Sequence, residues 1–295
     1  YVRILGFLLL YAPNRAVRHE VVKCIHSRRN ESDLTDVGQF FECYLIMPFK
    51  KYKGRTPKPS EHPSRPSFEG VKNQIKVDIS VAPKNHHDAK RKANNWRCIV
   101  TGLIDLDAPE DNIAPFEQSS PGIYTECAHI IPEATFFGLL DLSATILAVL
   151  QRFHCDITKF DGEKVHSLTN VMTLEHHIHD RFDRLELYFE ATVSSGTVVL
   201  SLNHSIHCVP SHRKIITRSN FTAGDPEHLP VPSPELLALH ATCCKVAKLS
   251  GSAEYIDRVY RDADEMDVLA PDGASGDVLS YLLSSLSNYS VGVRG

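Results

Sequence analysis

The sequence predicts an α+β protein in which a small module of short strands and one short helix lies between helical segments. Apolar residues recur at helical spacing near both ends of the chain. The middle carries β-branched and aromatic runs around a Gly-containing turn. We therefore divide the chain into a helical segment at 1–48, a basic, proline-rich arm at 49–83, the central module at 84–217 and a second helical segment at 218–295.

Residues 1–48 are predicted to form two helices. Asn14 is placed to cap the first, because apolar residues recur at every fourth position after it. Asp33 is placed to cap the second, which ends at Pro48. The arm that follows is rich in Pro, Ser, Lys and Arg, a composition typical of a linker.

A basic helix at 84–95 is expected to lead into the central module. The module's own predicted elements are strands at 97–100 and 123–131, a loop at 105–121, an apolar helix at 134–153, a short helix at 174–183 and a β-hairpin at 187–202. In the last segment, helices are predicted at 235–249, 254–267 and 276–287.

Four polar residues in the module point to chemistry. His129 lies in Ala-His-Ile-Ile-Pro near the end of a predicted strand, and Asn170 opens Asn-Val-Met-Thr-Leu. His179 and Asp183 follow at i and i+4, so they share one helix face and can bind one cation. Histidine, with an ordinary pKa of about 6.5, suits the role of a general base near neutral pH.

This order resembles that of the HNH (ββα-metal) endonucleases, in the branch with the patterns C-x-x-T-G, A-H-I-x-P, N-x-x-x-L and H-x-x-F-D. The matching segments are Cys98–Gly102, Ala128–Pro132, Asn170–Leu174 and His179–Asp183, within about a third of the chain. The outer segments are similar to those of uncharacterised fungal proteins that carry this domain. The resemblance implies a ββα-metal core and metal-dependent hydrolysis of phosphodiester bonds in DNA.

The resemblance also implies a role for each residue. His129 is the expected general base, and Asn170 is expected to hydrogen-bond the backbone around it. His179 and Asp183 are the expected ligands of one divalent ion, with His179 thereby part of the catalytic set. Mg²⁺ is the expected ion, with Mn²⁺, Zn²⁺ and Ni²⁺ as alternatives, because a mixed nitrogen and oxygen ligand set accommodates all four. Phe182 is expected to anchor the helix.

One position departs from many members of the family, which place a metal ligand directly before the base. Here that position is Ala128. Glu126 lies two residues earlier, on the same face of the strand, so it is our third candidate ligand. Either Glu126 reaches the ion, or two side chains hold the ion together with water and phosphate.

A nucleic acid, double-stranded DNA in our reading, is the expected partner. The net charge of −4 excludes a protein that coats nucleic acid through bulk positive charge, so local patches have to bind the phosphates. Arg181 and Arg184 lie on the predicted metal helix, and Lys90, Arg91 and Lys92 adjoin the module. The basic stretch 50–55 is a further candidate. We see no base-reading module.

The eight cysteines contain no Cys-x-x-Cys pair, which favours reduced thiols in an intracellular protein of the nucleus or cytoplasm. Cys98 and Cys127 are read as core thiols. The apolar opening at 4–12 is too short to span a bilayer, so no membrane association is expected. Because the chain begins with Tyr1 rather than Met, we expect a truncated N-terminus.

Two other functions compete with the nuclease. A catalytically inactive HNH fold that binds nucleic acid or protein would explain Ala128 and the negative charge. A structural zinc site is the second alternative, and its candidate ligands are His204, His207, Cys208 and His212.

Overall fold

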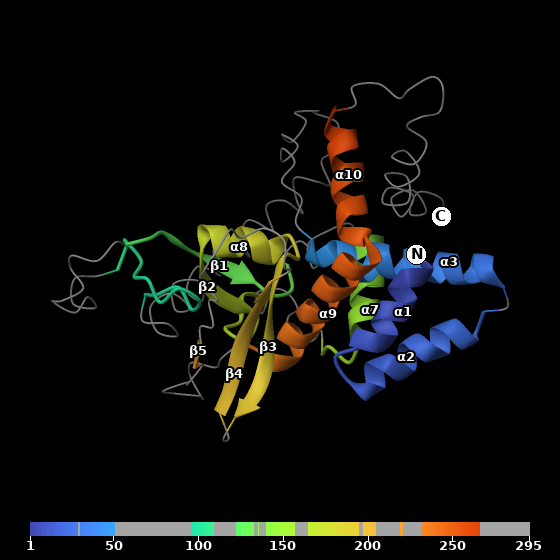
Figure 1. The fold of residues 1–295 in the computed structure, drawn as a ribbon, viewed down its shortest axis with the longest axis horizontal. Coiled ribbons are helices and arrows are strands. Elements are labelled where there is room, and N and C mark those ends of the chain that lie inside the picture. Colours follow the sequence, from blue (N-terminus) through green and yellow to red (C-terminus); the bar gives the residue numbers. More distant parts are fainter. Residues whose placement is uncertain are drawn as a thin grey trace.

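The computed structural model describes residues 1–28, 30–50, 96–108, 122–132, 135, 140–156, 165–194, 197–204, 219–220 and 232–265. Helices and small antiparallel sheets are both present, so the predicted α+β class is confirmed. Figure 1 shows the N-terminal helices on one side of the molecule and the strands on the other, with a long C-terminal helix between them.

Residues 1–28 and 30–50 form three helices where the sequence predicted two. They are α1 (Val2–Tyr11), α2 (Arg15–His26) and α3 (Glu31–Phe41). Helix α1 was missed because its nearly continuous apolar run has no helical period to detect. The predicted cap of α2 is confirmed, since Asn14 Oδ1 accepts a hydrogen bond of 2.9 Å from the Val17 N–H.

The predicted cap of the following helix is wrong. Asn30, not Asp33, caps α3, and its Oδ1 accepts a hydrogen bond of 2.8 Å from the Asp33 N–H. Capping at Asn30 places Asp33 in the first turn, where a negative charge stabilises the helix dipole. The helical path then continues through a π-helical turn, η1 (Glu42–Ile46), and a 3-10 turn, η2 (Met47–Phe49).

The centre of the module is an antiparallel pair, β1 (Thr125–His129) and β2 (Val171–Glu175), followed at once by α8 (His176–Asp183). The sequence did not predict β2, and it started the short helix two residues too early, at 174. The burial of Val171–Leu174 explains the error, because a strand buried on both faces has no alternating polar pattern.

The strand predicted at 97–100 is replaced by a tight turn. Arg97 makes only an isolated bridge with Ile104, and Gly102 between them has a φ of +70°, which glycine adopts without strain. The Ile99 N–H donates a 3.0 Å hydrogen bond to Thr173 O in β2. Because of this bond, the turn lies beside the β1–β2 pair.

The predicted hairpin is confirmed as β3 (Leu187–Ser194) and β4 (Thr197–His204), and a short β5 (Ser219–Asn220) pairs with β4. The predicted apolar helix is present as α7 (Leu140–Arg152), shorter in its described part than the predicted range 134–153. The predicted loop 105–121 and the basic helix 84–95 fall largely or wholly outside the described residues.

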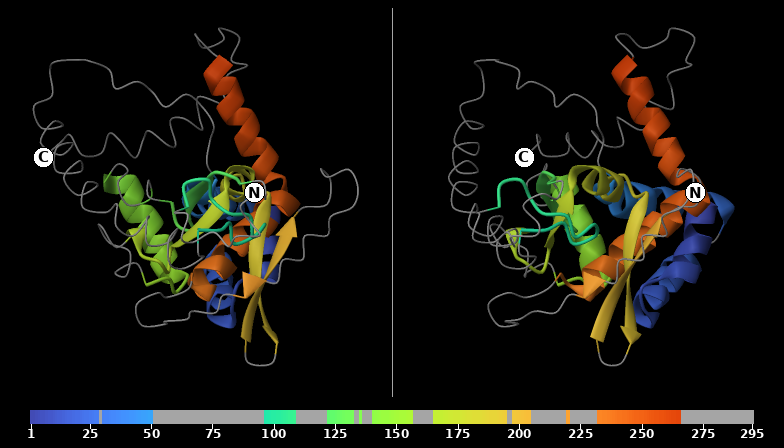
Figure 2. Two further views of the ribbon diagram at one scale, coloured as in Figure 1. Left: turned by 90° about the vertical axis from the view of Figure 1, so that its left-hand side faces the viewer. Right: turned by 60° about the vertical axis from the view of Figure 1, so that its left-hand side comes forward.

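Two C-terminal helices, α9 (Pro234–Ser250) and α10 (Ser252–Glu265), are confirmed, and the helix predicted at 276–287 lies outside the described residues. Helix α9 packs against α1 on one side and β3 on the other. Helix α10 projects from the body of the molecule in both views of Figure 2. One hydrophobic core contains residues of α1, α8 and α9, so the helical flanks support the central module.

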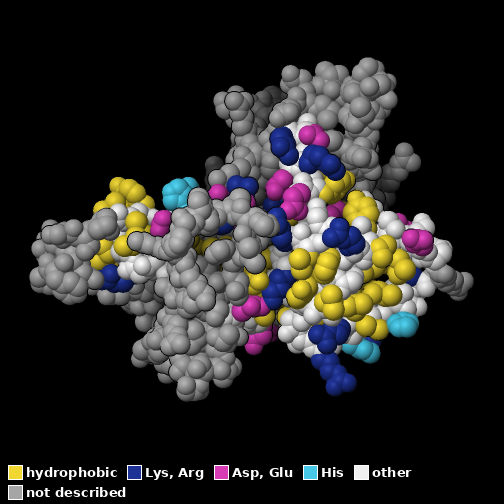
Figure 3. All heavy atoms as spheres, viewed as in Figure 1, with side chains coloured by type: hydrophobic (Ala, Val, Ile, Leu, Met, Phe, Trp, Pro, Cys, Tyr) yellow, Lys and Arg dark blue, Asp and Glu magenta, His cyan; other side chains and the backbone are white. Residues whose placement is uncertain are grey.

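Part of the surface over the N-terminal helices is apolar. Figure 3 shows hydrophobic side chains, with Lys and Arg among them, on the side where α1 and α3 lie; Val2 and Leu10 of α1 are exposed. Among the described residues, no helix has the length and apolar character needed to cross a bilayer. Among the described residues no cysteine forms a disulfide; Cys98 is a buried core thiol as predicted, whereas Cys127, predicted to be one as well, is only half-buried.

Candidate active site

Asn170 joins the end of β1 to the turn before β2. It is fully buried, and its Oδ1 accepts a hydrogen bond of 2.9 Å from the Ile131 N–H. Its Nδ2 donates to Ile131 O at 3.1 Å and to Val165 O at 2.8 Å. The hydrogen bond expected between Asn170 and the backbone around His129 is therefore present, two residues beyond the histidine.

His129, at the end of β1, contacts a second histidine. Its Nε2 lies 3.0 Å from His166 Nδ1, and the two rings meet edge to face. His166 is only 3% exposed. The sequence prediction missed His166, because a single histidine four residues before Asn170 carries no pattern of its own; its approach to His129 depends on the hydrogen bonds by which Asn170 binds both Ile131 and Val165.

Glu126, His179 and Asp183 form a second group on α8 and the strand beneath it. Glu126 Oε2 lies 2.6 Å from His179 Nδ1, while Asp183 Oδ2 lies 3.3 Å from His179 Nε2. The other carboxylate oxygen of Glu126 lies 2.8 Å from His176 Nδ1. The predicted site residues of strand and helix are thus brought together, with His176 as an exposed addition.

Charge within this group shifts two pKa values in opposite directions. Partial burial acts to lower the pKa of His179, but hydrogen bonds and charge from Asp183 and Glu126 outweigh burial, and the net pKa is raised. Partial burial acts to raise the pKa of Glu126, but the hydrogen bonds from His179 and His176 outweigh it, and the net pKa is lowered. Each shift favours the charged form of the pair.

Phe182 anchors α8 in the core, as expected from the sequence. Its ring stacks on His240 of α9, with centroids 3.8 Å apart and planes 9° apart. His240 Nε2 lies 3.2 Å from Phe182 O, a hydrogen bond in which the ring N–H donates. Burial lowers the pKa of His240 to about 4, so this ring is a neutral donor at physiological pH.

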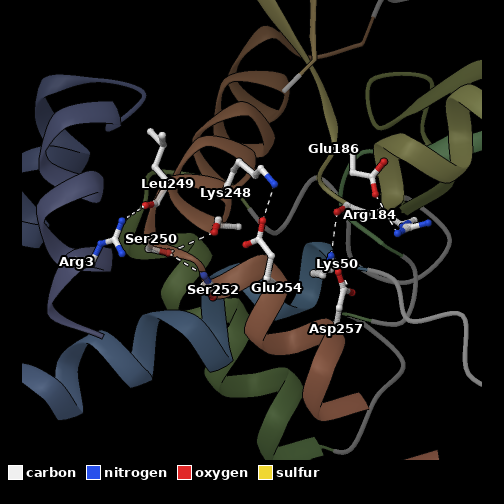
Figure 4. Close-up of polar contacts among 11 residues, drawn as sticks. Arg3, Lys50, Arg184, Glu186, Lys248, Leu249, Ser250, Ser252, Glu254 and Asp257 are labelled. Carbon is white, nitrogen blue, oxygen red and sulfur yellow. Dashed lines mark hydrogen bonds and ion pairs between the residues drawn. The ribbon is translucent and has the colours of Figure 1, made fainter. Parts of the chain in front are cut away.

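Lys50 binds the C-terminal end of α8. Its buried ammonium donates a 3.1 Å hydrogen bond to Arg184 O and lies 3.1 Å from Asp257 Oδ1 of α10 (Figure 4). A cation at the C-terminal end of a helix also complements the helix dipole. The interpretation of Lys50 as part of a phosphate-binding stretch is therefore wrong, because its charge is used inside the protein; residues 51–55 lie outside the described ranges.

The two arginines predicted to bind phosphate both contact one carboxylate. Arg184 lies 3.0 Å from Glu186, and Arg181 lies 3.6 Å from the same residue. Both pairs are partly exposed, and exposed pairs exchange partners at little cost. The remaining candidates, Lys90, Arg91 and Lys92, lie outside the described residues.

The side chains present fit a cation held by two protein ligands. Within the described ranges, no group of three or more His, Cys, Asp or Glu side chains is arranged to hold a metal ion. His179 Nε2 and Asp183 Oδ2 are 3.3 Å apart. Two ligands that each lie about 2.1 Å from one cation are roughly 3.0–3.4 Å apart at octahedral or tetrahedral angles. Ala128 is fully buried and offers no ligand.

The rival zinc cluster cannot be assembled from the described residues. The backbone of His204 ends β4, but His207, Cys208 and His212 lie outside the described ranges. The structural zinc site thus stays a prediction from the sequence.

The chain matches a known protein family over its central module. Residues 98–190 match the family model of the HNH endonucleases, a range that includes β1, β2, α8 and both groups of polar side chains. At the level of the family, this match indicates a nuclease-type function. No curated protein and no solved structure matches the chain.

Proposed function

We propose that this chain, with its HNH endonuclease region at 98–190, is a metal-dependent endonuclease that hydrolyses phosphodiester bonds of DNA. The observation that carries the proposal is the pairing of β1 with β2, directly continued by α8. This one unit bears both the candidate base, His129, and the candidate ligand pair, His179 and Asp183. A base and a cation site on one rigid unit are what hydrolysis of a phosphodiester requires.

In this proposal His129 accepts the proton of the attacking water. Asn170 fixes the backbone directly after it through Ile131. Because Asn170 is fully buried and bonded at both ends of its amide, the strand end cannot shift without breaking buried hydrogen bonds. The role of Asn170 is therefore to keep the ring of His129 in place while the reaction proceeds.

His179 and Asp183 would hold the divalent ion. When bound, the ion neutralises charge on the phosphoryl oxygens and stabilises the departing oxygen. Glu126 bonds His179 through Nδ1, which leaves Nε2, the nitrogen facing Asp183, as the ligating atom. We therefore assign Glu126 to orienting His179 rather than to binding the ion, an arrangement common around metal-bound histidines.

Arg181 and Arg184 would bind the DNA backbone beside the scissile phosphate. In the absence of DNA, both arginine side chains are held by Glu186 at the C-terminal end of α8. A phosphate replaces the carboxylate with a ligand of the same charge sign and hydrogen-bonding geometry. Binding would then depend on salt and would be insensitive to base sequence.

The test is nicking of supercoiled plasmid by the purified full chain with Mg²⁺, Mn²⁺, Ni²⁺ or Zn²⁺, and with EDTA. We expect His129→Ala to lower the nicking rate by about 10²–10⁴-fold, the usual contribution of a general base. The exposed His177→Ala on α8 is the matched control and should nick normally. Nicking that survives in His129→Ala, or in EDTA, would contradict the proposal.

A second candidate function is a catalytically inactive HNH fold that binds nucleic acid. The lack of a three-ligand group among the described residues, with Ala128 before His129, favours it. Folded protein that shifts a DNA duplex in a gel but cleaves nothing with any of the four ions would select this function.

A further inference from the structure

We propose that His166 is a positioning residue that fixes the tautomer of His129, with the proton on Nε2 and the basic lone pair on Nδ1. The inference rests on the proposed nuclease function, because it concerns the same base. The observation behind it is the 3.0 Å separation between His129 Nε2 and His166 Nδ1.

Burial and backbone hydrogen bonds hold His166 beside His129. His166 is 3% exposed, and the carbonyl of its neighbour Val165 accepts a 2.8 Å hydrogen bond from Asn170 Nδ2. The same amide group bonds Ile131, two residues after His129. Asn170 thus binds the segments that carry both histidines, and their relative position follows from one buried side chain.

A neutral imidazole has one N–H donor and one lone-pair acceptor. When His129 donates from Nε2, His166 Nδ1 is the acceptor and the lone pair of His129 lies on Nδ1. The proton of the attacking water then goes to His129 Nδ1, while the Nε2 proton stays where it is. His129 becomes an imidazolium that still donates to His166, and it later releases the Nδ1 proton to solvent. No proton moves onto His166.

A neutral histidine in this position does the orienting work that a carboxylate does in a Ser-His-Asp triad. Unlike a carboxylate, it adds no negative charge next to the phosphate. The expected consequence is an effect on kcat rather than on KM, because the tautomer affects proton transfer and not DNA binding.

Two variants separate positioning from packing. His166→Leu keeps a buried apolar side chain but removes the acceptor, whereas His166→Asn keeps an acceptor, because its Oδ1 occupies the place of Nδ1. We expect His166→Leu to lower kcat by about 10–100-fold with KM unchanged, the range seen when a residue that orients a catalytic ligand is removed. His166→Asn should recover most of that loss. His177→Leu is the surface control.

The direct readout is the ring nitrogen spectrum of the ¹⁵N-labelled full chain, with the His129 signals assigned by their loss in His129→Gln. We expect Nε2 of neutral His129 to be protonated in the wild type and in His166→Asn, and the two tautomers to be mixed in His166→Leu. Protonation at Nδ1 in the wild type, or an unchanged tautomer in His166→Leu, would overturn the inference. If His166→Leu does not fold, the wild-type and His166→Asn spectra still decide between the two tautomers.

These spectra need no turnover, so the two proposals fail separately. A chain that cleaves no DNA but shows the Nε2–H tautomer would refute the nuclease and leave the histidine pair intact. A chain that nicks DNA through His129 but shows the Nδ1–H tautomer would support the nuclease and refute the role of His166.

Discussion

The two halves of the candidate site are built in opposite ways. The His129 half is held by Asn170, a fully buried amide with three backbone hydrogen bonds. The His179 half is held by side-chain carboxylates; the side chains of His179 and Asp183 are 14% and 15% exposed, and that of Glu126 is 43% exposed. One half is part of the core, and the other is a group of partly solvated charges on the surface of the same unit.

The difference indicates which half can rearrange during the reaction. Breaking buried hydrogen bonds costs stability, so the base has one position. An ion pair with an exposed partner such as Glu126 contributes little to stability and exchanges partners readily, which suits a site that binds and releases an ion. The changes below should therefore separate folding effects in the first half from binding effects in the second.

Asn170→Ala should have the largest effect on stability. It leaves the N–H and carbonyl of Ile131 and the carbonyl of Val165 without a buried partner, and we expect the free energy of unfolding to fall by about 2–4 kcal/mol. Urea denaturation measures the change, with exposed His177→Ala as the control. A fall in the free energy of unfolding of less than about 0.5 kcal/mol would show that the His129 half is not held by the buried hydrogen bonds of Asn170.

Asp183→Ala should weaken cation binding without a comparable loss of stability. It removes one of the two proposed ligands, so we expect the Kd for Mn²⁺ to rise at least about 10-fold. Isothermal titration calorimetry of the full chain gives the Kd directly. The control is Asp180→Ala on the same helix, where the carboxylate lies 4.0 Å from Arg184. Equal effects of the two substitutions would argue against a site at Asp183.

Glu126→Gln should have the smallest effect on stability, measured as the pH dependence of the free energy of unfolding in the absence of metal. Because the pKa of Glu126 is lowered in the folded protein, Glu126 contributes to stability above its unfolded pKa of about 4.3, and this contribution is lost as pH falls through the folded pKa. Because the pKa of His179 is raised in the folded protein, His179 contributes to stability below its unfolded pKa of about 6.5, and this contribution is lost as pH rises through the folded pKa.

The contribution of the pair is therefore fullest between about pH 4.3 and 6.5. In that pH window we expect the free energy of unfolding of the wild type to exceed that of Glu126→Gln by less than about 1 kcal/mol. The difference is small because the Glu126 carboxylate is partly exposed and screened by solvent. Denaturation at several pH values between 3.5 and 8 measures the difference. A difference that does not vary with pH would show that Glu126 and His179 are not electrostatically coupled.

The sequence by itself determined the features that depend on local pattern. The α+β class, the Asn14 cap, the β3–β4 hairpin and helices α9 and α10 follow from residues close together in the chain. The i,i+4 spacing of His179 and Asp183 likewise predicted that they share a helix face, and in the structure His179 Nε2 and Asp183 Oδ2 lie 3.3 Å apart.

Only the tertiary structure decided what depends on distant segments meeting. Strand β2 has no alternating pattern, because both of its faces are buried, so its pairing with β1 was not predictable from local sequence. That pairing, together with the buried Asn170 side chain, brings His166 against His129, and it lets Glu126 reach His179 across 53 positions of chain. Likewise the burial of Lys50 against the end of α8 requires α10 to be in place. Local spacing defines a helix face, whereas packing of the whole chain defines the partner of each side chain.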